Sequence, residues 1–206
     1  MRKPLSLTEK IQKRIRARGE GALFVSRDFL DLGTRAAVDQ ALSRLAREGV
    51  IRRIGRGVYD VPRVSERLGI ALSPSPDAVA SAVAKSTASR FQVSGAQAAN
   101  ALGLSTQVPA RVVYLTDGTP RQIKLGNQVL EFRHAAPRSM MTAGRASGTV
   151  IQALRHLGKK QISPEVIRHL RTVLGKREKT MLRKDRAYAP GWMQPFVDEI
   201  VAEEKG

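Results

Sequence analysis

The apolar residues of the first sixty positions recur with a helical period. Ser6 followed by Glu9 has the spacing of a capping box, which predicts a helix over about residues 8–18. Thr34 precedes a stronger pattern, in which apolar side chains recur at i, i+3, i+4 and i+7: Val38, Ala41, Leu42 and Leu45. This spacing gathers the four side chains on one face of a helix over residues 35–48, which Thr34 is expected to cap.

Two shorter elements complete this N-terminal block. Ser26 is expected to cap a short helix that buries Phe29 and Leu30. After Gly49, two apolar runs flank a glycine-containing tip at residues 55–57, which is typical of a β-hairpin. The order helix, helix, turn, helix, hairpin predicts a winged helix-turn-helix domain over residues 1–61.

The rest of the chain predicts a small α+β module, residues 62–137, and then a basic helical segment, residues 138–206. In the module we expect two helices, residues 77–88 and 95–102, and a short extended stretch at 91–93 between them. Three strands follow, 111–116, 121–125 and 128–134, and the last two are joined by a hairpin loop at Gly126-Asn127. In the segment we expect four helices, with Trp192 as a packing anchor: 143–157, 164–173, 175–186 and 191–203. The module and the segment are expected to pack as one domain, and the fold class is α+β.

The charge of the chain says more about its partner than its length does. The 206 residues include 36 Lys and Arg against 18 Asp and Glu, a formal net charge of +18. Residues 145–186 alone hold 12 basic and 3 acidic side chains. Such an imbalance in a chain with enough apolar residues for a core indicates a polyanionic partner, most commonly nucleic acid. A ribosome-like or merely basic surface is the alternative.

The composition also narrows the chemistry. The chain has no cysteine, so it has no disulfide, no thiolate nucleophile and no cysteine zinc site. Its three histidines are scattered, and it has no phosphate-binding glycine loop, nucleophile elbow or paired carboxylates. We therefore expect no enzyme activity, no metal and no cofactor. No apolar run suits a signal peptide or a membrane span, so a cytoplasmic location away from membranes is expected.

The candidate site lies on the N-terminal block. The helix at 35–48 is expected to enter the major groove of DNA, and its polar positions are the candidate contacts: Arg35, Asp39, Gln40, Ser43, Arg44 and Arg47. The hairpin adds three candidates for phosphate or the minor groove: Arg52, Arg53 and Arg56. Arg27 and Thr34, at helix starts, suit backbone phosphate. Strand alternation separates Arg52 from Arg53 and leaves open that Arg53 faces the core side of the wing.

Several stretches resemble AbiEi-type antitoxins. Residues 41–59 look like the end of their winged helix, and residues 93–104 with Phe132-Arg133 look like their second part. Residues 189–193 are similar to a related group of AbiEi-like proteins. The resemblance implies a repressor that binds inverted repeats in the promoter of its own toxin–antitoxin operon. It also implies a nucleotidyltransferase-like toxin as partner, neutralised without a stable complex.

The resemblance assigns DNA contacts to a subset of the candidate site: Thr34, Arg35, Gln40, Arg44, Arg52 and Arg56. Two other interpretations remain open. One is a protein-interaction module that holds a toxin directly through residues 62–206. The other is an RNA-binding protein that uses the basic helices of residues 145–186, although an aromatic content of 4% disfavours stacking on single strands.

Overall fold

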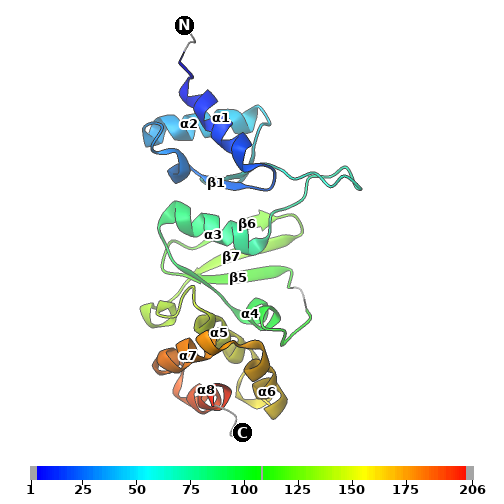
Figure 1. Ribbon diagram of the computed structural model, residues 1–206, viewed down its shortest axis with the longest axis vertical. Helices are drawn as coiled ribbons and strands as arrows, with labels where there is room; N and C mark the ends of the chain where they lie inside the picture. Colours follow the sequence, from blue (N-terminus) through cyan, green and yellow to red (C-terminus); the bar gives the residue numbers. More distant parts are fainter. Residues whose placement is uncertain (1–3, 108, 203–206) are drawn as a thin grey trace. The chain divides into compact units, whose positions relative to one another are not determined.

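The computed structural model describes residues 4–107 and 109–202, and its class is α+β, as predicted (Figure 1). The chain divides into two compact units. The first contains residues 1–89 and 123–127, and the second contains residues 90–122 and 128–206. The first unit therefore extends beyond the 1–61 block in which the sequence predicts the winged helix.

Two helices of the first unit follow the sequence prediction closely. In α1 (Leu7–Arg18) the capping box forms, because the Ser6 N–H donates to Glu9 Oε2 at 2.7 Å and the Glu9 N–H donates to Ser6 Oγ at 3.3 Å. In α2 (Arg35–Arg47) the Ala37 N–H donates to Thr34 Oγ1 at 3.4 Å. The four apolar residues of the α2 stripe are buried, as the period predicts.

The predicted hairpin forms and gains a third strand that the sequence pattern did not indicate. The strands β1 (Leu23–Val25), β2 (Arg52–Gly55) and β3 (Val58–Asp60) make an antiparallel sheet in the order β1-β3-β2. The register shifts between Arg53 and Gly55, and Gly57 turns the tip with φ +73°. Helix, helix and three-stranded sheet together give the winged-helix arrangement.

The short element after β1 differs from its prediction. It is a 3-10 turn, η1 (Ser26–Phe29), capped from Val25, whose N–H donates to Asp28 Oδ2 at 2.9 Å. The expected cap is wrong, because the Ser26 hydroxyl instead donates to Asp39. Phe29 is buried, but Leu30 is 43% exposed. Consecutive residues of a helical turn point in different directions, so both could not reach the core.

The helix after the proline-rich connection also belongs to the first unit. It is α3 (Pro76–Thr87), within one residue of its predicted bounds, with Pro76 in its first turn. The Ser75 hydroxyl caps it by accepting the Ala78 N–H at 3.3 Å. Helix α3 packs against β1 and β3, so a helix from outside residues 1–61 also contacts the winged-helix sheet.

The second sheet has the predicted strands in an arrangement that local sequence does not reveal. Its order is β4-β5-β7-β6, with bounds β4 (Phe91–Val93), β5 (Arg111–Thr116), β6 (Arg121–Leu125) and β7 (Gln128–His134). The strands β5 and β7 pair in parallel from Arg111↔Val129 to Thr116↔His134. After β5 the chain therefore first forms the edge strand β6, and it then returns as β7, which lies between β5 and β6.

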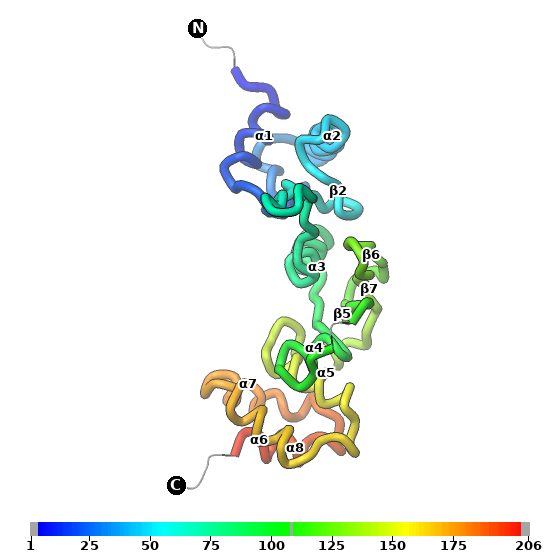
Figure 2. The backbone as a smooth tube through the Cα atoms, turned by 90° about the vertical axis from the view of Figure 1, so that its right-hand side faces the viewer, coloured from blue at the N-terminus to red at the C-terminus, as the bar shows by residue number. Residues whose placement is uncertain are grey.

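The C-terminal helices gather around one apolar core, which α4 (Gly95–Ala101) shares (Figure 2). They are α5 (Ala146–Leu157), α6 (Pro164–Val173), α7 (Lys176–Asp185) and α8 (Gln194–Val201). Each lies inside its predicted range. The end of the 191–203 prediction, residue 203, lies outside the described residues. Trp192 is 37% exposed and its ring meets that of Phe196 edge-on, and Phe196 packs against this core, so Trp192 is a packing residue at the core's margin.

None of the helices in the described part of the chain is both long and apolar enough to cross a membrane.

Candidate nucleic-acid interface

The exposed face of α2 has a stripe of polar residues, on the opposite side from the buried apolar stripe of the helix. Gln40, Ser43, Arg44 and Arg47 follow one another at i, i+3, i+4 and i+7, and all four are exposed. They line a shallow groove that Leu7 and Thr8 of α1 border. The structure thus brings four predicted site residues together on one surface whose opposite side is fixed in the core.

Two arginines of α2 form ion pairs with the carboxylates of Asp39 and of Glu48, the residue at which the helix ends. Arg35 Nε lies 3.0 Å from Asp39 Oδ2, and Asp39 also accepts the Ser26 hydroxyl. Arg44 Nε lies 2.8 Å from Glu48 Oε1, and this carboxylate raises the pKa of Arg44. The guanidinium side chains remain 50% and 66% exposed. Exposed i,i+4 pairs contribute only about 0.3–0.5 kcal/mol, so either arginine can exchange its carboxylate for phosphate at small cost.

The wing separates its three arginines into one structural residue and two free ones. Arg52 donates from Nε to Asp60 Oδ1 at 3.1 Å and from Nη2 to Asp60 Oδ2 at 2.7 Å, which raises the pKa of Arg52. Its Nη2 also donates to the Leu72 carbonyl at 2.8 Å. Alternation along β2 is as expected, but it is Arg52 that turns inward, while Arg53 is exposed.

Four arginines of the candidate set keep their full donor capacity. Within residues 4–107 and 109–202, no hydrogen bond or ion pair engages the side chains of Arg27, Arg47, Arg53 or Arg56, and all four are exposed. The remaining helix-start candidate, Thr34, is exposed as well, with its hydroxyl oxygen accepting in the α2 cap. Free guanidinium groups beside amide and hydroxyl donors suit a surface rich in phosphate and base-edge acceptors.

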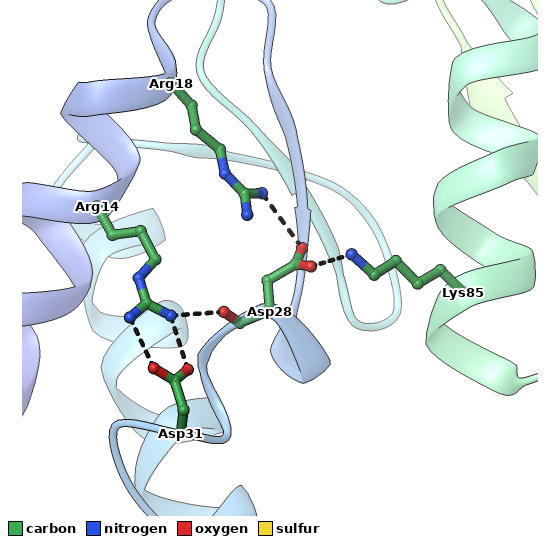
Figure 3. Close-up of polar contacts among 5 residues, drawn as sticks. All are labelled: Arg14, Arg18, Asp28, Asp31 and Lys85. Carbon is green, nitrogen blue, oxygen red and sulfur yellow. Dashed lines mark hydrogen bonds and ion pairs between the residues drawn. The ribbon is translucent and has the colours of Figure 1, made fainter.

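A second group of cations, which no sequence pattern indicated, is paired with two carboxylates (Figure 3). Arg14 makes a two-bond pair with Asp31, both N–O distances being 2.7 Å, and donates to the Asp28 carbonyl at 3.0 Å. The Asp28 carboxylate, 4% exposed, pairs with Lys85 of α3 and with Arg18 at 3.7 Å. These cations hold α1, η1 and α3 together. No sequence signal links Asp28 to Lys85, because 57 positions separate them.

The carboxylates of this cluster act as structural partners. The Arg14 guanidinium lowers the pKa of Asp31, and Asp31 in turn raises the pKa of Arg14. Across the described ranges, no three His, Asp or Glu side chains come close enough together to hold a metal ion.

A model of a protein family of unknown function, DUF6088, matches residues 10–182, most of the chain. The chain belongs to the DUF6088 family. The DUF6088 match runs from α1 into α7 and thus includes the whole sheet of the winged helix and the second sheet. Comparisons with curated proteins and with solved structures found no match.

Proposed function

We propose that the protein is a sequence-specific DNA-binding repressor. The observation that carries the proposal is the exposed stripe of α2, on which Gln40, Ser43, Arg44 and Arg47 share one face beside the free wing arginines. The third helix of a winged helix-turn-helix lies in the major groove, where amide, hydroxyl and guanidinium groups read base edges. In this proposal Arg53 and Arg56 contact phosphate or the minor groove.

Arg52 has a different part in this proposal from the one its position in the wing first indicates. Its guanidinium is committed to a carboxylate that is only 2% exposed and to a backbone carbonyl. It therefore fixes the base of the wing, and Arg53 and Arg56 present the charge. This division supports a wing whose shape is set before DNA arrives.

The resemblance to AbiEi-type antitoxins extends the proposal. The DNA would be the promoter of the protein's own operon, bound at inverted repeats. The operon would also encode a nucleotidyltransferase-like toxin, which the protein neutralises without a lasting complex. The support for this extension is the motif resemblance in residues 41–59 and 93–104 together with the winged helix.

A gel-shift titration tests the proposal directly. The probe is the DNA upstream of the gene, compared with a shuffled duplex of the same composition, at about 50 and 150 mM salt. Selective binding of the upstream DNA at the higher salt is expected, and Gln40→Ala should reduce the preference by about 1–3 kcal/mol for the base pair that it reads. Equal, salt-sensitive binding to both duplexes would contradict a repressor, because phosphate contacts alone carry no sequence information.

A further inference from the structure

The second unit contains a cationic groove that the proposed winged-helix interface does not involve. Helices α6 and α7 and the end of α8 form its walls, and its volume is about 720 Å³. Four cations and two hydroxyls line it: Arg171, Thr172, Lys176, Lys179, Thr180 and Arg183. No acidic side chain is among its described lining residues. Among the residues that the structure describes, the charge of these cations therefore has no acidic counterpart in the groove.

The geometry of α7 explains why the acids of this region do not neutralise the groove. Lys176, Lys179 and Arg183 are spaced i, i+3 and i+7, so they share one face of the helix. Glu178 lies on the other side and accepts the Gly175 N–H at 2.8 Å as a cap. The buried Asp185 pairs instead with Arg145 at 2.8 Å and with the Ser147 hydroxyl at 2.5 Å.

Two of the four cations are fixed in position by backbone groups. Arg171 Nε donates to the Glu199 carbonyl and Arg183 Nη2 donates to the Val201 carbonyl, both at 2.8 Å. These carbonyls belong to the last turn of α8, where acceptors lack the regular i+4 helical partner, and the Glu199 carbonyl also accepts the Ala202 N–H at 3.3 Å. In the described part of the chain, neither Lys176 nor Lys179 makes a side-chain hydrogen bond or ion pair. The groove thus combines two oriented guanidinium groups with two free ammonium groups.

We propose that this groove binds the phosphodiester backbone of a nucleic acid duplex, independently of the winged helix. From Lys176 to Arg183 the α7 face spans about 10 Å, at about 1.5 Å per residue, which is long enough for successive phosphates rather than one. Arginine and lysine donors are the usual partners of phosphate, and they carry the contact here, because the two threonine hydroxyls donate to the Arg168 and Lys176 carbonyls. The lining includes no aromatic side chain among the described residues, so base stacking does not contribute and binding is independent of sequence.

Two matched double variants of the full chain test this site. Lys176→Gln with Lys179→Gln removes the two free ammonium groups of the groove and leaves the arginines that hold α8. Lys159→Gln with Lys160→Gln removes the same charge from exposed positions of the same unit outside the groove. Fluorescence anisotropy with a random 20-base-pair DNA duplex, and with an RNA duplex of the same sequence, is measured over a range of salt concentrations. Inorganic triphosphate and a poly-glutamate peptide serve as competing polyanions.

The groove variant should lower the slope of log affinity against log salt by about two, because each of the two lysines neutralises one phosphate, while the control variant leaves the slope unchanged. A lower slope with DNA alone, RNA alone or both supports the proposal and identifies which duplex the groove accepts. Equal slopes for the two variants would overturn it. It would also be overturned if the groove variant bound both duplexes normally and had weaker affinity only for triphosphate or poly-glutamate.

Discussion

At the residue scale, two arginines four positions apart in the wing have different surroundings. Arg52 is paired with buried Asp60, whereas Arg56 at the tip is exposed, and its side chain makes no hydrogen bond or ion pair in the described part of the chain. Composition and position in the hairpin do not distinguish them. Strand alternation predicts that Arg52 and Arg53 face opposite ways, but only the location of Asp60 on β3, directly opposite Arg52, decides which one turns inward.

This difference predicts opposite consequences for the same substitution. Arg52→Gln leaves the Asp60 carboxylate buried with fewer charged donors and should lower the free energy of unfolding by about 1–3 kcal/mol. Arg56→Gln should leave the free energy of unfolding within about 0.5 kcal/mol and weaken binding to every DNA sequence alike. Urea unfolding and DNA titrations of both variants measure the two effects. A stable Arg52→Gln, or an unfolded Arg56→Gln, would show that the roles are assigned wrongly.

At the scale of elements, the signals that lie within one element predict the structure best. The sequence predicts the bounds of α2 and α3 within one residue, because caps and apolar periods lie within the helix itself. Strand β1 has only three residues, Leu23–Val25, too few for an alternating pattern. The strands β5 and β7 pair in parallel although β6 lies between them in the sequence. No local turn signal therefore encodes this pairing.

The sequence predicts the candidate site to a similar depth. The period that buries Val38 and Leu45 also exposes Gln40 and Arg47, so the polar face of α2 follows from the sequence alone. The sequence does not show which cations are free and which are paired, because a paired cation can have its partner far away along the chain. Asp28, for example, meets Lys85 only once α3 is in place.

A close approach between β4 and α5 gives a prediction at this scale. A Cβ added to Gly148 of α5 would overlap Gln92 Oε1 and the Thr142 carbonyl oxygen. Gly148→Ala should therefore lower the free energy of unfolding by about 1–3 kcal/mol through overpacking. Gly191→Ala is the matched control, since no atom lies within 4 Å of its added Cβ, and it should be neutral or slightly stabilising. Equal stability of the two variants by urea unfolding would mean that α5 can move away at no cost.

At the scale of the whole molecule, the net charge of +18 opposes folding through self-repulsion. Salt screens this repulsion, so raising sodium chloride from about 20 to 300 mM should raise the Tm. The chain with Lys159→Gln and Lys160→Gln, which has two fewer positive charges, should show a smaller rise. Calorimetry at the two salt concentrations measures the effect, and a Tm that falls with salt would show that the surface ion pairs outweigh the repulsion.

The candidate interface on the first unit is cationic through arginine alone. No lysine occurs between Lys13 and Lys85, so α2 and the wing contain none, whereas the groove of the second unit has Lys176 and Lys179. Enzymatic acetylation acts on lysine amines and leaves guanidinium groups charged. Acetylation can therefore neutralise half of the cations in the groove while the charge of α2 and the wing remains intact. The two surfaces therefore differ in whether acetylation can change their charge.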